Sequence, residues 1–356
     1  MTPRTFILCT LPALLLGACA SVDAPGRGAV VFATVETPSV GTANADAADD
    51  PAIWASPRPV IIAGASTPGF VAGTDKKAGL YVYGFDGRIL QFLAAGLLNN
   101  VDVVEGLSVN GRPQVLLGAS DRSPGRMGAS LYLFDPAATG AGNAVRPWGL
   151  ITSDLQEPYG FCFGRREGQI HAFLIGKDGQ VRQLVISADA AGDPVGREVR
   201  RFAVGSIAEG CAVDETNDAL FIGEELTGVW RYGLDPASGD ARSRIGAVDG
   251  DRLTADVEGV TLLQDGDKRY LIVSSQGDSA FAVWRMDGPE PLYAGRFAVH
   301  GGERTDEVTG TDGVDALGGA VGPFPEGLVV VQDDVNDGAQ NFKYIDWRDI
   351  RAALGL

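Results

Sequence analysis

The sequence predicts an all-β protein, a six-bladed β-propeller, and three observations support this fold. The 356 residues include 49 glycines and 19 prolines, which suits many short strands joined by turns. Helical periodicity is absent until residues 350–356. Similar segments recur about every 50 residues, the length of a propeller blade. Six such blades of antiparallel strands fill residues 30–350 and would close around a central channel.

The first strand of each repeat is introduced by an acidic residue. These acids are Glu105, Glu157, Glu209, Glu258 and Asp312. In the fourth of these repeats Asp256 and Glu258 point the same way, because residues two apart in a strand share a face. In a propeller the first strands surround the channel, so the acids would form a circle of carboxylates. We therefore expect the chemistry at one mouth of the channel.

Two further strands complete each repeat. The second is apolar and ends in a polar turn, at residues 70–75, 115–121, 172–178, 220–225, 270–276 and 328–333. The third alternates apolar and aromatic residues, at 80–86, 131–135, 181–185, 229–232, 281–285 and 342–345. Six copies of each strand predict one propeller domain over residues 45–356.

The N-terminal segment predicts export. Residues 1–18 combine a basic start with a short apolar core, as in a secretory signal, and end in Leu-Gly-Ala-Cys19. This end resembles a bacterial lipobox, which implies cleavage before Cys19 and lipidation of its thiol; an ordinary signal cleaved near Ala20 is the alternative. Residues 19–44 would be a flexible tether with a first strand at 29–35. We expect a secreted protein, either an outer-membrane lipoprotein or a periplasmic or extracellular protein, that touches membrane only through the lipid.

The chain is strongly acidic. Its formal net charge is −17, and removal of residues 1–18 takes away Arg4 and no acid, which leaves −18. Such a protein should repel nucleic acid. An anionic substrate would need local positive charge.

Two cysteines remain in the expected mature domain, Cys162 and Cys211. They lie five and two residues beyond the acids of their repeats, and therefore at different heights on neighbouring strands. A disulfide needs close Cα atoms, so we expect buried free thiols rather than a bridge.

The acids of the repeats form an oxygen-rich set of candidate metal ligands. Crowded carboxylates repel one another and raise each other's pKa values unless a cation neutralises them. Oxygen donors favour Ca²⁺, and His171 and His300 lack the spacing of a zinc site. The candidates are Asp50, Asp102, Glu209, Asp256, Glu258 and Asp312, with the amides of Asn100 and Gln276. Ions that only stabilise the propeller are the alternative.

Basic residues occupy equivalent turns of the first three repeats. They are Lys76, Lys77, Arg122 and Lys177, joined by the phenol of Tyr159. Cations beside a calcium cluster would bind phosphate; solvent-exposed turns and a packed aromatic residue are the alternatives. Covalent phosphatase chemistry is not supported, because no Arg-His-Gly-x-Arg segment occurs and Gly168 stands where a cysteine phosphatase loop needs arginine. A metal-activated water is the remaining nucleophile.

Taken in order, these segments resemble the β-propeller phytases, the calcium-dependent alkaline phytases of bacteria, over residues 45–350. Matching stretches include Asp49-Asp-Pro-Ala-Ile-Trp54, Gly73-Thr-Asp-Lys-Lys77, Glu157-Pro-Tyr-Gly160, Ala255-Asp-Val-Glu-Gly259 and Thr311-Asp-Gly-Val-Asp315. The resemblance implies a 3-phytase-type phosphomonoesterase that holds several Ca²⁺ ions and hydrolyses myo-inositol hexakisphosphate (phytate), presented as its calcium complex. We expect it to act as a monomer.

The resemblance also implies roles for individual residues. Calcium ligation falls to Glu209, Asp256, Glu258, Asp306, Asp312 and one or both of Glu224 and Glu225. Structural calcium falls to Asp50, Asn100, Asp102 and the loop from Asp333 to Asp337, and phosphate contacts to Lys76, Lys77, Arg122, Tyr159 and Lys177. The expected catalytic set is Glu209, Asp256, Glu258, Asp312, Lys76, Arg122, Tyr159 and Lys177, with Gln276 as a further metal ligand.

Two other classes of function are weighed against this one. A propeller lactonase or sugar dehydrogenase would also use an acid-lined calcium site, but a basic rim serves no neutral sugar. A propeller that only binds a partner would present an exposed apolar face instead of a mouth surrounded by cations.

Overall fold

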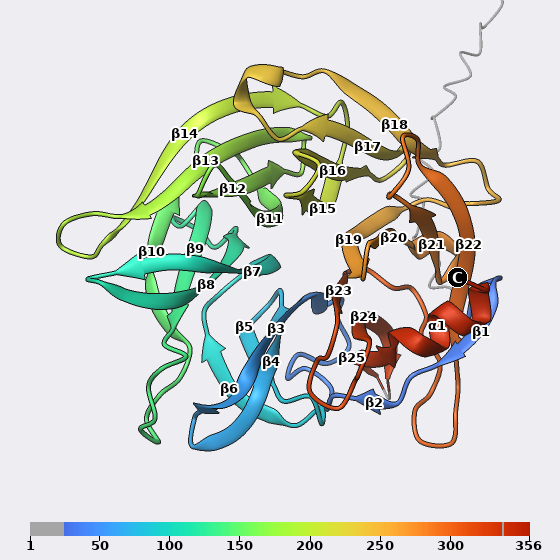
Figure 1. The fold of residues 1–356 in the computed structure, drawn as a ribbon, viewed down its shortest axis with the longest axis horizontal. Coiled ribbons are helices and arrows are strands. Elements are labelled where there is room, and N and C mark those ends of the chain that lie inside the picture. Colours follow the sequence, from blue (N-terminus) through green and yellow to red (C-terminus); the bar gives the residue numbers. More distant parts are fainter. Residues whose placement is uncertain (1–24, 337) are drawn as a thin grey trace, which may run out of the picture.

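The computed structural model describes residues 25–336 and 338–356 and confirms the six-bladed β-propeller (Figure 1). Six sheets of strands stand around a central channel. The expected signal segment and Cys19 lie outside the described residues. Within those residues, no helix is long and apolar enough to cross a membrane.

Each blade runs from the channel outward as consecutive antiparallel strands. Blade 1 contains β3 (Ala48–Ile62), β4 (Ala65–Asp75), β5 (Gly79–Tyr83) and β6 (Ile89–Ala94), and blade 2 contains β7 (Leu98–Val109), β8 (Arg112–Asp121), β9 (Gly128–Phe134) and β10 (Arg146–Thr152). Blade 3 contains β11 (Pro158–Arg166), β12 (Gln169–Gly176), β13 (Gln180–Ala188) and β14 (Pro194–Ala203), and blade 4 contains β15 (Ala208–Asp214), β16 (Ala219–Glu224), β17 (Gly228–Gly233) and β18 (Arg242–Ala247). Blade 5 contains β19 (Val257–Asp265), β20 (Lys268–Ser275), β21 (Ala280–Arg285) and β22 (Leu292–His300), and blade 6 contains β23 (Val314–Gly318), β24 (Gly327–Asn336) and β25 (Ala339–Asp346).

The N-terminal segment closes the ring. Strand β2 (Val35–Glu36) pairs with β25 and supplies the outermost strand of blade 6, while β1 (Ala29–Phe32) adds a parallel fifth strand to blade 5 through β22. The strand expected at residues 29–35 therefore exists as two short strands in the sheets of the last two blades. The helix α1 (Trp347–Leu354) packs near β1 (Figure 1).

The core lies between blades. Strands β5 and β9 are buried along their whole length, because neighbouring blades cover both of their faces. Trp54, Phe70 and Phe134 form a three-ring contact that joins blades 1 and 2, with centroids 5.4 to 5.9 Å apart. This packing fixes the inner strands that line the channel.

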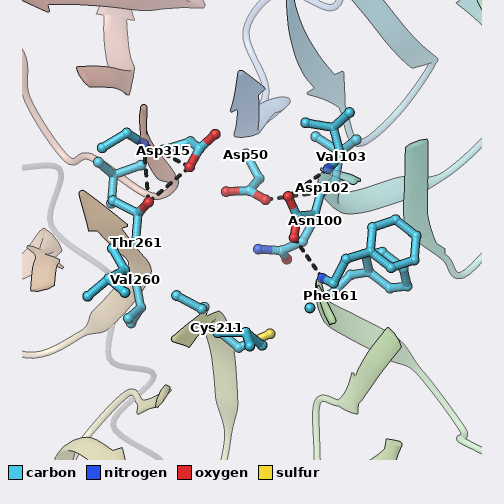
Figure 2. A pocket seen from close by; sticks show the side chains of 18 of the residues that line it. Asp50, Asn100, Asp102, Val103, Phe161, Cys211, Val260, Thr261 and Asp315 are labelled. Atoms are coloured by element: carbon cyan, nitrogen blue, oxygen red, sulfur yellow. Dashed lines mark hydrogen bonds between the residues drawn. The ribbon is translucent and has the colours of Figure 1, made fainter. Parts of the chain in front are cut away.

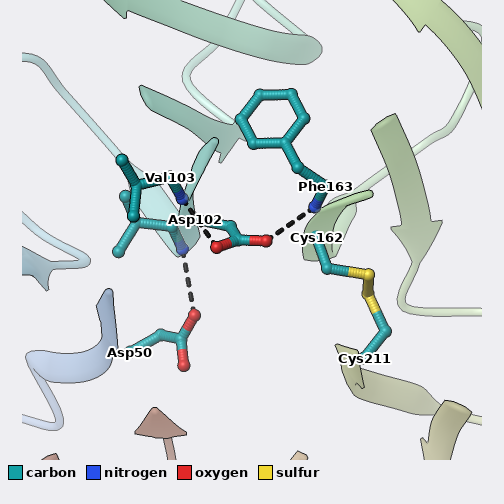
Figure 3. The surroundings of a disulfide bond; sticks show 7 residues. Asp50, Asp102, Val103, Cys162, Phe163 and Cys211 are labelled. Atoms are coloured by element: carbon teal, nitrogen blue, oxygen red, sulfur yellow. Dashed lines mark hydrogen bonds between the residues drawn. A yellow bond between two sulfur atoms is a disulfide. The ribbon is translucent and has the colours of Figure 1, made fainter. Parts of the chain in front are cut away.

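A disulfide joins blades 3 and 4, so the expectation of free thiols was wrong. Cys162 on β11 and Cys211 on β15 are bonded, with Cα atoms 5.7 Å apart (Figure 3). The error arose because the position of Cys162 along its strand was counted from Glu157, which is not equivalent to Glu209. A Cβ atom at Gly160 would lie 2.0 Å from the carbonyl oxygen of Glu209, so these two residues are level. Two residues further along each strand, the cysteines face each other.

Candidate functional site

One residue from each inner strand or its approach contributes to a ring at the mouth of the channel. In five blades the ring residue directly follows the first residue of the inner strand that pairs with the second strand. These ring residues are Asp49, Asn99, Tyr159, Glu209 and Glu258. Asp312 takes the sixth place, because its carbonyl accepts from Gly259 N and the next residue, Gly313, donates to Asp49 O.

This ring corrects the series of acids expected from the sequence. Glu209, Glu258 and Asp312 take their predicted places, but Asn99 and Tyr159 stand where Glu105 and Glu157 were expected. Glu105 lies six residues further along β7, beside a β-bulge, and accepts a hydrogen bond from Trp54 Nε1 at 2.7 Å. Glu157 lies in the turn before β11. The acids were therefore not equivalent in all repeats.

Three buried glutamates form the centre of the mouth. Ligand atoms of Glu209, Glu225 and Glu258 lie within 4.8 Å of one another, beside a cavity of about 450 Å³. Glu258 Oε2 is buried and has no hydrogen-bond partner among the described residues. Burying a carboxylate without a partner is costly. An all-oxygen donor set with an unpaired buried oxygen fits a hard divalent cation.

The pKa values of this cluster reflect the same cost of burying carboxylates close together. Burial and the charge of Asp256 raise the pKa of Glu225 to about 7. Burial raises the pKa of Asp312 to about 8, although Lys76 lies beside it. Burial and the nearby Glu209 raise the pKa of Glu258 well above its usual value. Without a cation, the cluster therefore holds protons near neutral pH.

Lys76 lies inside the ring of acids instead of on the rim. Its Nζ is 2.7 Å from Asp46, 2.8 Å from Asp49 and 3.3 Å from Asp312, and its side chain is only 7% exposed. Burial alone would lower the pKa of Lys76, but these carboxylates raise it well above its usual value. The ammonium group is thus a fixed counter-ion for one side of the ring.

The rim cations gather around Tyr159. Arg122 and Lys177 lie over its ring, with 5.8 and 4.8 Å from the charged groups to the centroid. Arg122 Nη1 donates to Glu157 Oε1 at 3.2 Å, and Lys177 Nζ lies 3.9 Å from the same oxygen. Lys77 is exposed and does not line the cavity at the mouth. The positive charge at the mouth therefore comes from Lys76 of blade 1 and Lys177 of blade 3, which line the cavity, with Arg122 of blade 2 beside them over the ring of Tyr159.

Neighbouring glutamates in blade 4 point in different directions. Glu224 accepts hydrogen bonds from Ser206 Oγ and Trp230 Nε1, both at 2.7 Å, and so faces away from the cluster. Glu225 alone joins the mouth. Of the two glutamates, one or both of which the resemblance implied as ligands, only Glu225 therefore lies at the mouth.

Blade 5 contributes a corner of the mouth. Asp256 follows a cis peptide bond with Ala255, and its carbonyl accepts a hydrogen bond from Gln276 N at 2.9 Å. Gln276 begins the short helix η2 (Gln276–Asp278), and its side-chain amide donates to Asp312. Both predicted ligands line the cavity at the mouth with the three glutamates.

Asp50, Asn100 and Asp102 lie deeper in the channel, apart from the mouth. They line a cavity of about 180 Å³ together with Asp315 and Thr261 (Figure 2). The predicted circle of ligands is therefore divided into two levels. Burial and the charge of Asp315 raise the pKa of Asp102 to about 7.

The deeper carboxylates connect neighbouring blades. Asp102 accepts from Phe163 N of blade 3 at 2.7 Å, and Asp315 accepts from Ile53 N of blade 1 at 2.7 Å. Thr261 Oγ1 accepts from Ala316 N of blade 6 at 3.1 Å. Strand pairing puts Asp102, Thr261 and Asp315 at the position that Cys162 occupies in blade 3. One position of the repeat thus joins blades by hydrogen bonds or by the disulfide (Figure 3).

Asp306 and Asp333 form a third group around a buried lysine in blade 6. Lys343 Nζ lies 3.1 Å from Asp333 and 2.9 Å from Glu36, and it also bonds Asp306. Burial raises the pKa of Asp333 to about 6, against the lowering effect of Lys343. These two predicted metal ligands are therefore separate from the mouth cluster, with a lysine cation already between them.

Sequence reasoning missed several site residues. Asp46, Asp49, Asn99 and Asp315 were given no ligand or binding role, yet each contacts the ring or the channel. Asn99 Nδ2 donates to Asp49 at 2.9 Å and to Glu209 at 2.7 Å. The sequence did point to their neighbourhood, because three of the four lie within the matching stretches or next to a predicted ligand. Only strand register tells which member of an adjacent pair faces the mouth.

The mouth of this closed propeller combines buried carboxylates with neighbouring cations. These features define a class of protein: a propeller with a carboxylate cluster that could hold a metal ion and with cations suited to an anionic substrate. A model of the family described as Phytase matches residues 4–356, and the chain belongs to that family. It is 34% identical over 367 residues to a 3-phytase of Bacillus subtilis (strain 168), which covers 99% of this chain and 94% of the relative.

Two solved structures are more distantly similar. A GH43_1 enzyme from Xanthomonas citri has a TM-score of 0.41 and 14% identity, covering 65% of this chain and 83% of that chain. BBS1N in complex with ARL6DN has a TM-score of 0.43 and 12% identity, covering 78% of this chain and 74% of that chain. Neither likeness carries an argument about function.

Proposed function

We propose that this protein hydrolyses phosphomonoesters of phytate in a calcium-dependent reaction, releasing inorganic phosphate and lower inositol phosphates. The observation that carries the proposal is the mouth itself, where buried carboxylates lie beside cations on a chain of the phytase family. A polyanionic substrate needs such local positive charge, because the chain as a whole has a net charge of −17.

Glu209, Glu225, Glu258, Asp256 and Asp312 are the residues that would hold calcium at the mouth. When bound, Ca²⁺ supplies positive charge for phosphate oxygens and makes a water molecule more acidic. Asn99 keeps the Glu209 carboxylate in place by a hydrogen bond of 2.7 Å. Lys76 balances Asp49 and Asp312, which leaves the glutamates of blades 4 and 5 available to a cation.

Arg122, Lys177 and Tyr159 would bind substrate phosphate. The guanidinium binds two oxygens at once, and the ammonium acts as a point charge. Burial and the charges of the nearby glutamates raise the pKa of Tyr159, so its hydroxyl keeps its proton and donates. These groups orient the ester and stabilise the negative charge that develops on the phosphoryl group. Asp50, Asn100 and Asp102 would hold a structural cation deeper in the channel.

We also propose that the protein is exported, anchored through Cys19, and active as a monomer. The disulfide supports an oxidising compartment, because structural disulfides are rare in reducing cytosol.

Purified protein incubated with phytate and, separately, with a sugar lactone tests the function. We expect phosphate release from phytate and no opening of the lactone. Lactone hydrolysis without phosphate release would favour the alternative enzyme class, and neither reaction would favour a binding propeller.

A further inference from the structure

Glu157 lies between the two cations that we assign to substrate phosphate. Its Oε1 accepts a hydrogen bond from Arg122 Nη1 at 3.2 Å and lies 3.9 Å from Lys177 Nζ. Both cations also lie over the ring of Tyr159. The four side chains therefore form a closed group, in which a carboxylate oxygen occupies the position between two cations.

The Glu157 side chain can leave this position without disturbing the strand behind it. It is 44% exposed, whereas its main-chain carbonyl accepts a hydrogen bond from Lys177 N at 3.0 Å. The next residue, Pro158, begins β11. Main-chain bonding thus keeps the turn in place while the carboxylate rotates into solvent. The ion pair is open to solvent on the side of Glu157, whereas Arg122 is only 15% exposed, so an anion of higher charge can replace the carboxylate on a cation that stays in place.

We propose that Glu157 is a specificity-determining residue whose carboxylate holds the place of a phosphate between Arg122 and Lys177 until substrate displaces it. This inference rests on the proposed function. A singly charged anion gains little, because it replaces one negative charge with another. A phosphate dianion gains, since it brings more charge and more oxygens to the same two cations. The residue therefore favours substrates that carry several dianionic phosphates, and it helps to release the phosphate product by returning.

The matched variants are Glu157→Gln and Glu215→Gln. Glutamine keeps the size of the side chain and removes its charge. Glu215 is the control, because it is a half-exposed glutamate paired with Arg165 at the opposite end of β11. Sulfate is the probe, since it is a tetrahedral dianion that does not interfere with the measurement of released phosphate. Its inhibition constant against phytate hydrolysis is measured in saturating calcium, and Tm confirms that each variant is folded.

We expect the inhibition constant of sulfate to fall about threefold in Glu157→Gln and to stay unchanged in Glu215→Gln, as for removal of one partner of an exposed ion pair. Glu157→Asp withdraws the carboxylate from both cations and should change the constant in the same direction by less. An unchanged constant in Glu157→Gln overturns the proposal. A higher one also overturns it and makes Glu157 a residue that positions the cations.

Failure of the proposed function has a different signature. Wild-type protein that releases no phosphate from phytate refutes that function but leaves the placeholder role open to a second readout. The rise of Tm with sulfate, compared with chloride at equal ionic strength, then measures anion binding directly. A larger rise in Glu157→Gln than in wild type supports the placeholder role, and an equal or smaller rise rejects it.

Discussion

At the residue scale, the functional side chains differ most in whether they are buried with a partner or exposed. Arg122 is mostly buried and forms an ion pair with a half-exposed carboxylate, whereas Glu258 is buried with one oxygen unpaired. Substitution should therefore affect binding in the first case and the balance between activity and stability in the second.

Arg122→Ala should lower kcat/KM for phytate by about tenfold to a hundredfold, because it removes a charge-assisted contact with substrate phosphate. Arg122→Lys keeps the charge but not the two-pronged geometry, so it should be intermediate. Steady-state kinetics of both variants in saturating calcium checks this. Tm should change little. Wild-type kinetics in Arg122→Ala would show that Arg122 does not bind substrate.

Glu258→Gln should raise the Tm of the calcium-free protein, most of all above neutral pH, because burial disfavours the charged form of Glu258 and raises its pKa well above the usual value, whereas glutamine is neutral at every pH. The same change should lower activity by about tenfold or more, since a ligand of the proposed cation is lost. Thermal unfolding in EGTA and kinetics in calcium measure the two effects. Glu290→Gln, at the exposed turn on the opposite face, is the control and should alter neither. A calcium-free variant less stable than wild type would contradict the assignment.

Sequence patterns identified most of these residues but not how they are grouped. Glu209, Asp256, Glu258 and Asp312 were predicted together and lie together. Lys76 was expected on the rim and lies among acids, because a lysine at the end of a strand can turn toward the channel or toward solvent. Period-2 alternation gives a residue's face, whereas its level along the channel depends on bulges and register.

At the element scale, the inner strands hold the site, and one position of the repeat connects them between blades. The disulfide is the covalent form of this connection, and it bridges 49 residues of sequence. Asp102 and Asp315 make the corresponding connections with hydrogen bonds. Blades 3 and 4, which carry Tyr159 and Glu209, are therefore joined just below the mouth.

The double variant Cys162→Ala, Cys211→Ala should lose about 2–4 kcal/mol of unfolding free energy, the usual contribution of a disulfide that closes a loop of this size. Denaturant unfolding with and without reductant measures the loss. Reductant should destabilise wild type alone. Activity in saturating calcium should persist, because main-chain contacts still hold Gly160 beside Glu209. Equal stability of the variant and the oxidised wild type would show that the bridge contributes nothing.

The strand pattern was predictable where neighbouring blades bury both faces. The second and third strands of all six repeats appear where the apolar runs predict them, for example β8 and β9 of blade 2. The outermost strands were not predicted individually. Only two of the ten residues of β14 are buried, and β2 has only two residues, so neither leaves a distinct periodic pattern.

At the scale of the whole molecule, the repeat predicted six blades, but closure of the ring depends on pairing between the two ends of the chain. Residues 35–36 complete blade 6, more than 300 residues away in sequence. Local sequence patterns cannot predict a pairing between segments so far apart. The channel that results gathers acids of different blades at two levels, and their raised pKa values couple folding to proton binding.

The calcium-free protein should become less stable as pH rises from about 4 to about 8. Asp102 and Asp312 have pKa values of about 7 and about 8 in the folded chain, against about 4 for unfolded aspartate. Between these values the folded chain keeps protons that the unfolded chain has released, so raising the pH favours unfolding. Tm is measured in EGTA across this range for wild type and for Asp102→Asn. The variant keeps the contribution of the other groups, so the difference between the two slopes belongs to Asp102. A calcium-free Tm that rises over the same range would contradict it.

The central claim is that calcium at the mouth both activates hydrolysis and stabilises the propeller, and one titration tests it. Protein dialysed against EGTA is titrated with Ca²⁺ while phosphate release from phytate and Tm are followed on the same samples. We expect almost no release without calcium, then a rise of activity and Tm together, because ions that bind only the folded chain stabilise it. Undiminished phosphate release after exhaustive dialysis against EGTA would contradict the account.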